Sequence, residues 1–182
     1  MPMMKTELPD PPSAAGTPAD GAGFADLAGK YLTFFLGGET YGIPVLKVRE
    51  IISMLPITQV PQVPAYMKGV INLRGKVIPV VDLRAKFSLE SAEATSSTCI
   101  VVVQIRGSEG QTKLIGLIVD AVEEVANIAQ ADIEPTPDFG GSISVQYILG
   151  MAKIKGAVKS LLDIDQIIAA DTIEHITSNI AA

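Results

Sequence analysis

Residues 69–82 read GVINLRGKVIPVVD, and this stretch decides the fold. Two apolar runs flank the pair Arg74-Gly75, and glycine at the second position of a turn accepts a positive φ at little cost. The pattern therefore predicts a tight β-hairpin with Arg74 at its tip. Because Pro79 has no N–H to donate to a neighbouring strand, we expect the second strand to lie at a sheet edge or to be bulged there.

The segment before this hairpin carries the signals of a second one. Residues 31–36 (YLTFFL) form a short apolar run, GGET follows as a turn, and TYGIPV at 40–45 resumes the apolar pattern. We interpret this region as a β-hairpin. LKVREII at 46–52 fits either a short helix or a bent strand, and the two prolines within 57–66 favour an edge or a connector.

The rest of the chain alternates polar stretches with runs of Val, Ile and Leu. The polar stretches contain turn residues and predict loops, while the apolar runs predict strands. In chain order we expect a loop at 88–98, strands at 98–106 and 113–120, a loop at 135–144, a strand pair at 147–163 and a closing helix at 164–179. The helix is expected because isoleucines recur there at roughly helical spacing.

Composition narrows the class of protein. Of the 182 residues, 48% are hydrophobic but only 5% are aromatic, so Val, Ile, Leu and Ala supply the bulk of the core. The Val and Ile content favours strands. The net charge of −6 disfavours nucleic acid as a partner. A lone cysteine cannot form an internal disulfide, and no apolar stretch approaches the ~20 residues that span a membrane. We therefore expect a soluble, cytoplasmic protein.

The first 29 residues differ from the rest. They are rich in Pro, Gly, Ala and Asp and show no apolar periodicity. Such a segment buries too little apolar surface to fold, so we expect residues 1–29 to be a disordered tail and order to begin at Lys30.

Two motifs occur twice, in the same order. The first, G-x-x-V-x-x-V-x-E-[IV], covers 42–51 and 116–125, and the second, Y-x-x-G-x5-G-x6-D, covers 66–82 and 147–163. Two matches in order indicate a structural duplication. Each half is too small to bury a core well alone, so we expect two similar β units that share an apolar interface.

The residues that usually carry catalysis are scarce. His175 is the only histidine and lies in the predicted closing helix, while Cys99 opens an apolar run and is interpreted as a buried small hydrophobe. One His and one Cys do not make a zinc site, and no phosphate-binding glycine motif is present. Asp82 and Asp163 recur at matching repeat positions and are expected to cap the segments that follow. We therefore expect no enzyme activity, metal or cofactor.

Four segments resemble the CheW family of chemotaxis coupling proteins, in the order of that family. They are YLTFFLGGETYGIPVLKVREI (31–51), VPAYMKGVINLRGKVIPVVDLRAKF (63–87), LIGLIVDAVEEV (114–125) and YILGMAKIKGAVKSLLDID (147–165). The pair Lys159-Ser160 is more polar than the family pattern leads us to expect. The resemblance implies a mainly β fold of two packed SH3-like five-stranded β-barrels with short helices and a C-terminal helix. It places a CheW-like domain at 30–182, with halves at about 31–90 and 98–170, and leaves open whether these exchange elements.

The resemblance also implies a non-catalytic adaptor. Such proteins couple the cytoplasmic tips of methyl-accepting chemoreceptors to the regulatory domain of a CheA-type histidine kinase, and receptor arrays recruit them to the inner face of the membrane. The residues implied to face the receptor are Val48, Glu50, Gly69, Asn72, Arg74 and Val77. Those more loosely implied to face the kinase are Ile115, Leu117 and Val119.

Three other functions remain open at this stage. The first is a CheW-like adaptor of another chemosensory pathway, such as pilus motility. The second is a regulatory fragment of a larger kinase, although the chain has no ATP-binding motif. The third is a small-molecule-binding or enzymatic β-barrel, against which the scarcity of catalytic groups argues.

Overall fold

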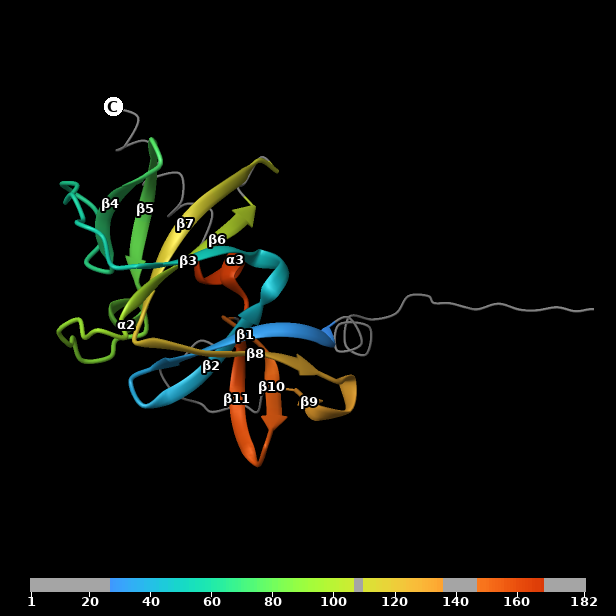
Figure 1. Cartoon of the computed structure of the whole chain (residues 1–182). Coiled ribbons are helices and arrows are strands. Elements are labelled where there is room, and N and C mark those ends of the chain that lie inside the picture. The colour runs from blue at the N-terminus through green and yellow to red at the C-terminus, as the bar shows by residue number, and fades with distance from the viewer. Residues whose placement is uncertain (1–26, 107–109, 136–146, 169–182) are drawn as a thin grey trace, which may run out of the picture.

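A computed structural model describes residues 27–106, 110–135 and 147–168 of the chain (Figure 1). Most of the predicted tail, nearly all of the predicted loop at 135–144 and the second part of the predicted closing helix lie outside these residues. Order was expected to begin at Lys30, but Leu27 already packs against the fold and the first strand begins at Gly29. The Tyr31 hydroxyl donates a hydrogen bond of 2.6 Å to the Leu27 carbonyl oxygen, which anchors this start.

The first sheet forms barrel A. Its strands, in spatial order, are β8 (Ala121–Ile128), β1 (Gly29–Leu36), β2 (Glu39–Pro44), β11 (Ala157–Leu162), β10 (Ile148–Ile154) and β9 (Ile133–Glu134). The two outer strands, β8 and β9, follow each other in the chain across the 3₁₀ turn η2 (Gln130–Asp132). They act as one bent strand that pairs with β1 at one end and β10 at the other, which closes the sheet on itself.

The second sheet forms barrel B. Its strands, in spatial order, are β3 (Val48–Ser53), β6 (Cys99–Arg106), β7 (Thr112–Val119), β5 (Lys76–Asp82) and β4 (Met67–Leu73). The chain beyond β3 closes it, because Thr58 exchanges backbone hydrogen bonds of 2.8 and 2.9 Å with Val70 of β4. The fold class is thereby confirmed as mainly β with two packed five-stranded units, counting β8 and β9 as one strand.

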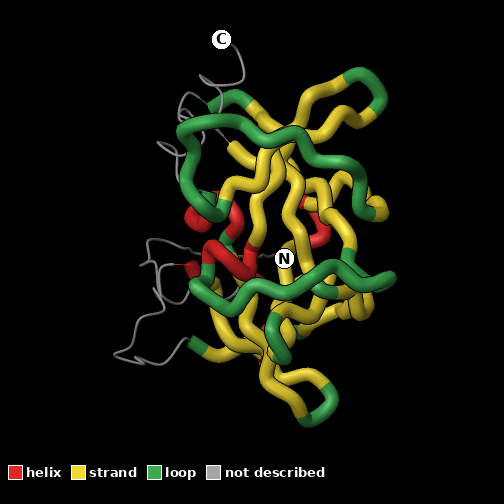
Figure 2. The backbone as a smooth tube through the Cα atoms, turned by 90° about the vertical axis from the view of Figure 1, so that its left-hand side faces the viewer, coloured by secondary structure: helices red, strands yellow, loops and turns green. Residues whose placement is uncertain are grey.

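Three short helical elements lie at the level between the barrels (Figure 2). They are the 3₁₀ turn η1 (Val45–Lys47), α2 (Leu83–Lys86) and α3 (Ile164–Ile167). Because η1 leads directly into β3, the segment at 46–52 contains both a helical turn and a strand. The side chains of Asp82 and Asp163 accept hydrogen bonds from Arg84 N and Gln166 N, so the predicted capping role of both aspartates is confirmed.

The hairpin at 69–82 has the predicted turn. Arg74 and Gly75 have φ values of 53° and 86°, the pattern of the primed turn that suits two-residue hairpins. The edge position expected for Pro79 is wrong, because β5 lies between β4 and β7. Opposite Pro79, Val70 directs its hydrogen bonds to Thr58, and the pairing of β5 with β7 begins only at Val80. The missing N–H of proline therefore costs no ladder hydrogen bond.

The two halves of the chain exchange strands. Barrel A combines β1 and β2 with β8 to β11, whereas barrel B combines β6 and β7 with β3 to β5. Residues matched by the repeated motifs occupy matching places in the two barrels. Gly42 pairs with Leu161 across the parallel β2–β11 contact, and Gly116 pairs with Val80 across the parallel β7–β5 contact. A Cβ at Gly42 would lie 3.1 Å from the Leu161 side chain, and a Cβ at Gly116 would lie 2.8 Å from Ile100 and 3.5 Å from Val80.

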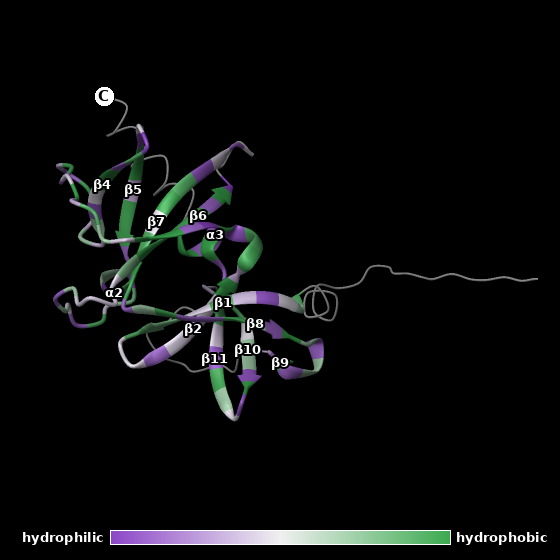
Figure 3. Ribbon diagram, in the orientation of Figure 1, coloured by the Kyte–Doolittle hydropathy of each residue, from purple (hydrophilic) through white to green (hydrophobic). Residues whose placement is uncertain are grey.

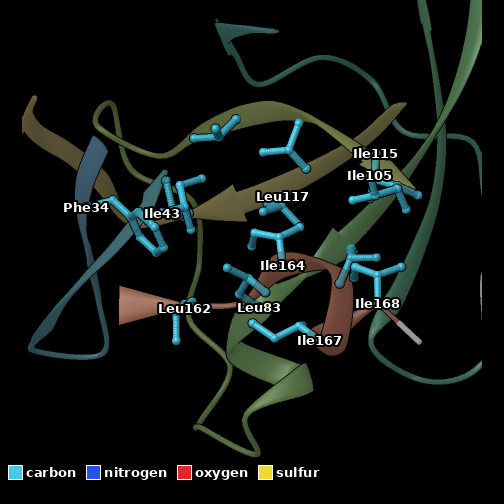
Figure 4. Close-up of a cluster of buried hydrophobic side chains, with 14 of the residues drawn as sticks. Phe34, Ile43, Leu83, Ile105, Ile115, Leu117, Leu162, Ile164, Ile167 and Ile168 are labelled. Atoms are coloured by element: carbon cyan, nitrogen blue, oxygen red, sulfur yellow. The ribbon is translucent and has the colours of Figure 1, made fainter. Parts of the chain in front are cut away.

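The exchange creates three apolar clusters. One fills each barrel, and the largest lies between the barrels, where strands of both and the helix α3 meet (Figure 4). In β6, Ile100 and Val102 face the interior of barrel B, while Val101 and Val103 face the central cluster. A strand buried on both faces reads as a continuous apolar run, which explains CIVVVQI. Figure 3 shows the same apolar character along β5 and β7.

The polar pair Lys159-Ser160 has a structural explanation. Lys159 pairs across the sheet with Ala152, a member of the cluster inside barrel A, so its side chain enters the barrel. It is only 4% exposed, and its Nζ lies 2.8 Å from Glu123 Oε1. Thr33 also donates a hydrogen bond of 2.9 Å to that oxygen. The buried ammonium is therefore paired, as burial of a charge requires.

Candidate partner-binding surface

Glu50 and Arg74, two of the predicted receptor-facing residues, contact each other directly. Glu50 lies on β3 and Arg74 at the tip of the β4–β5 hairpin, so they belong to opposite edges of the sheet in barrel B. Arg74 NH1 and NH2 donate hydrogen bonds of 2.6 and 2.8 Å to Glu50 Oε2 and Oε1. These bonds hold the pKa of Glu50 below its usual range. The result is an exposed, bidentate ion pair.

An apolar side chain missed by the sequence analysis lies beside this strand. Leu46 of η1 is 94% exposed and lines a cleft of about 220 Å³ with Lys47, Gln104 and Arg106. In the sequence, Leu46 is only one apolar residue of the segment LKVREII at 46–52. The one feature of the sequence that could have indicated its exposure is its position just before the strand β3, outside any regular helix or strand that would bury it. This leucine lies at the junction of the two barrels, where its side chain is accessible to a partner.

The walls of this cleft are tied to α3. Lys47 Nζ forms a salt bridge of 2.7 Å with Asp165 Oδ2, and the Arg106 backbone N–H donates a hydrogen bond of 3.1 Å to Asp165 Oδ1. Arg49 also donates a hydrogen bond to Gln104. These contacts join η1, β3, β6 and α3, so the walls of the cleft are positioned by contacts within the protein.

The other predicted receptor-facing residues have different surroundings. Val48 is half-buried and packs against the central cluster. Asn72 is exposed, and its Oδ1 accepts a hydrogen bond of 2.9 Å from Gly75 N, which stabilises the turn. Val77 pairs with Asn72 across the hairpin and is 55% exposed. Asn72 and Val77 thus lie near Arg74, whereas Val48 shares a strand with Glu50 but points inward.

Gly69 is a buried structural residue. It has a φ of 143°, and a Cβ there would lie 2.0 Å from the Thr58 carbonyl oxygen, the acceptor that closes barrel B. It sits at the end of β4 far from the hairpin tip. Gly69 therefore supports the hairpin and has no side chain that could contact a partner.

The residues implied to face the kinase are buried in this structure. Ile115, Leu117 and Val119 are at most 1% exposed and belong to the central cluster between the barrels. Figure 4 shows Ile115 and Leu117 in this cluster. Because both faces of β7 are covered, its apolar residues contact the fold itself. Their side chains are not available to a partner in this structure.

Barrel A carries a counterpart of the Glu50–Arg74 pair. At the matching repeat positions, Lys155 Nζ lies 3.3 Å from Glu124 Oε1. Two exposed valines also match exposed residues of barrel B. Val125 and Val158 are 57% and 58% exposed, and their repeat counterparts Ile51 and Val77 are 44% and 55% exposed. The repeat therefore places an ion pair and exposed apolar side chains on both barrels.

Other chemistry is limited in the part of the chain that the structure describes. No group of three or more His, Cys, Asp or Glu in that part is arranged to hold a metal ion. Cys99 is half-buried against the central cluster, and burial raises the pKa of its thiol. His175 lies outside the described residues. None of the described helices is long and apolar enough to cross a membrane.

Two closed, strand-exchanged barrels with exposed ion pairs and apolar side chains define a β-barrel interaction protein. The family model of the CheW-like domain matches residues 30–172 of the sequence. The chain therefore belongs to the CheW-like family.

Known relatives cover most of the chain. The chemotaxis protein CheW of Rhizobium meliloti is 34% identical over 77% of this chain and 87% of its own length. The chemotaxis protein CheW of Klebsiella aerogenes is 32% identical over 78% and 82%. The crystal structure of the scaffolding protein TtCheW from Thermoanaerobacter tengcongensis superposes with a TM-score of 0.70 and 33% identity, covering 80% of this chain and 96% of that one.

Proposed function

We propose that the protein is a non-catalytic chemotaxis adaptor. In this role it couples the cytoplasmic tips of chemoreceptors to the regulatory domain of a CheA-type histidine kinase. It works in the cytoplasm and is recruited to the inner face of the membrane by receptor arrays. The observation that carries the proposal is the similarity over most of the chain to proteins named as chemotaxis and scaffolding proteins.

The proposed receptor surface is centred on the junction of the two barrels. A receptor tip is a helical hairpin, and a helix docks by placing apolar side chains in a groove with charges at its rim. Leu46 and the cleft beside it supply the apolar contact, and Glu50 and Arg74 supply the charges. The guanidinium of Arg74 already donates two hydrogen bonds to Glu50, so a receptor carboxylate would bind beside Glu50 or replace it as the partner of Arg74.

The proposed kinase surface lies on barrel A. Ile115, Leu117 and Val119 are buried, so exposed groups of barrel A would contact the kinase instead. Val125 and Val158 are the exposed large apolar side chains of β8 and β11, and the Lys155–Glu124 pair supplies charges. Separate surfaces on separate barrels would let the adaptor hold both partners at once, which coupling by linkage requires.

A matched pair of charge reversals tests this assignment. Arg74→Glu and Lys155→Glu each reverse the exposed cation at the tip of one hairpin, at equivalent repeat positions. Arg74→Glu should weaken the pull-down of receptor tips by roughly tenfold or more and leave kinase binding unchanged. Lys155→Glu should do the reverse. Binding of both partners by both variants would show that the surfaces are assigned wrongly.

Co-purification with the histidine kinases and receptors of the source organism tests the pathway. Capture of a kinase and receptors that control swimming would support the chemotaxis role. Capture of the components of another chemosensory cluster, such as one for pilus motility, would keep the adaptor function and change the pathway. Failure to capture any kinase would contradict the proposal.

A further inference from the structure

A second cavity lies away from the Leu46 cleft and has a different character. Its volume is about 580 Å³, and its walls come from β2, β10 and β11 of barrel A and from the turn that follows α2. This volume lies within the range of about 300–1,000 Å³ that is typical of small-molecule sites. Such sites occur preferentially where two structural units meet, as the two barrels do here.

Aromatic and aliphatic side chains form most of the walls. Tyr41 and Phe87 lie with ring centroids 5.7 Å apart, and Tyr147 and Met151 line the same cavity. Burial, with a further effect of Glu39, raises the pKa of Tyr41, so its phenol stays neutral at physiological pH. The interior is therefore suited to an apolar group.

The wall that follows α2 is held in place by its own hydrogen bonds. Ser88 N donates to Ala85 O at 3.1 Å, and Leu89 N donates to Arg84 O at 2.7 Å. Ser88 has a φ of 61°, so these bonds form the left-handed cap that commonly ends a helix. The cap fixes Phe87 and Leu89, so this wall of the cavity is positioned by the protein's own hydrogen bonds.

One cation, Lys86, lines this cavity. Lys86 Nζ lies 4.1 Å from the ring centroid of Tyr66 and 5.8 Å from that of Tyr147. Among the described residues it forms no salt bridge, although Lys47 and Lys159 each have a carboxylate partner. Of the described residues that line the cavity, Glu39 is the one with an acidic side chain. An ammonium that lies near two aromatic rings and lines a largely apolar cavity is a suitable partner for a carboxylate.

We propose that this cavity binds a small amphiphilic monocarboxylate. The carboxylate would pair with Lys86, and the apolar part would lie against Tyr41, Phe87 and Met151. Glu39 and the net charge of −6 disfavour a second negative group on the ligand. The inference is independent of the adaptor role, because neither receptor nor kinase binding requires a bound ligand.

Three probes of equal chain length test the chemistry. Decanoate, decan-1-ol and decyltrimethylammonium share an apolar tail and differ in the charge of the head group. Isothermal titration should show saturable binding of decanoate to the full-length protein, at least about tenfold tighter than that of decyltrimethylammonium. Backbone amide shifts in NMR spectra should change around Phe87, Met151 and Ser160. Equal binding of all three probes would contradict the pairing with Lys86.

Two variants and one control locate the site. Lys86→Gln should weaken decanoate about tenfold and leave decan-1-ol unchanged, because only the charge is lost. Ser160→Leu fills the cavity and should weaken both probes. Lys76→Gln removes an exposed cation of the β4–β5 hairpin and should change neither. Decanoate binding that resists both cavity variants would overturn the proposal.

Two further outcomes decide against a small ligand. If decanoate does not bind at millimolar concentration, the cavity is not a site for this class of molecule. If it does not bind, but a receptor or kinase fragment protects the amides of Phe87 and Ser160, the cavity belongs to a protein interface. Lys86 is half-exposed, and Lys86→Gln leaves the apolar walls intact. The binding measured for this variant therefore tests the proposal even if Ser160→Leu unfolds the protein.

Discussion

Arg74 holds Glu50 across the closed edge of barrel B. The two residues are 24 positions apart and lie on the two outer segments of one sheet, yet both carboxylate oxygens accept hydrogen bonds from the guanidinium. The equivalent pair in barrel A, Glu124 and Lys155, makes one longer contact of 3.3 Å. Arginine matches a carboxylate with two parallel bonds and lysine does not, so the two barrels present the same charges in equivalent places but with different hydrogen-bond geometry.

Exchanging the two charges of this pair separates its structural role from its role in binding. The double variant Glu50→Arg and Arg74→Glu should keep an ion pair between β3 and the hairpin and melt close to the wild-type temperature. It should not recover receptor binding, because a partner meets the opposite charge at each position. Thermal unfolding and a receptor pull-down measure the two effects. Recovery of full binding would contradict the proposed receptor surface.

Replacing Gly69 should act through the fold. Gly69→Ala places a Cβ against the Thr58 carbonyl and adds strain at a φ of 143°, so we expect a loss of roughly 2–4 kcal/mol in the free energy of unfolding. Gly75→Ala is the matched control, since nothing lies within 4 Å of its Cβ, and it should cost about 1 kcal/mol. Chemical denaturation measures both. Similar losses would show that the close approach to Thr58 does not matter.

The buried residues of β7 should also act through stability. Leu117→Ala removes a fully buried side chain from the central cluster and should cost about 2–5 kcal/mol. At a temperature where the variant remains folded, its affinity for the kinase should equal that of the wild type. A binding isotherm at that temperature, with folding followed by circular dichroism, checks this. A folded variant with weakened kinase binding would restore Leu117 as a contact residue.

Asp120 should make the protein sensitive to acid. Arg84 Nε and NH2 donate hydrogen bonds of 2.8 and 2.7 Å to its carboxylate, and Gly37 N donates a third of 2.9 Å. The bonds from Arg84 hold the pKa of Asp120 below its ordinary value of 3.8. A carboxyl whose pKa is lower in the folded state stabilises the fold above its unfolded pKa. That stability is lost as the pH falls through the folded value.

The corresponding variant is Asp120→Asn. It should lose about 1–2 kcal/mol at pH 7 and show a smaller further loss than the wild type between about pH 5 and 2. Urea unfolding at a series of pH values measures this. Glu93→Gln, in the exposed loop before β6, should keep the wild-type profile. An unchanged slope in Asp120→Asn would show that its carboxylate does not contribute.

Local chemistry explains which features could be read from the chain. The hairpin at Arg74-Gly75 was predicted because a primed turn needs two residues with positive φ, and the flanking runs supply both strands. The caps at Asp82 and Asp163 depend on hydrogen bonds within three residues, so they too could be predicted. Leu46 was missed because its exposure depends on where η1 lies between the barrels.

By itself, the sequence determined the turns, the caps, the duplicated motifs and the β-rich class, since each depends on neighbouring residues or on composition. Only the tertiary structure decided which half supplies each strand, why Pro79 is tolerated inside a sheet, and that Leu117 is buried. It also brought Glu50 to Arg74. These depend on pairings between distant segments, and the alternation of side chains within a strand does not reveal which neighbour covers each face. In this protein both faces of β7 are covered, so the side chains that were expected to contact the kinase lie in the core.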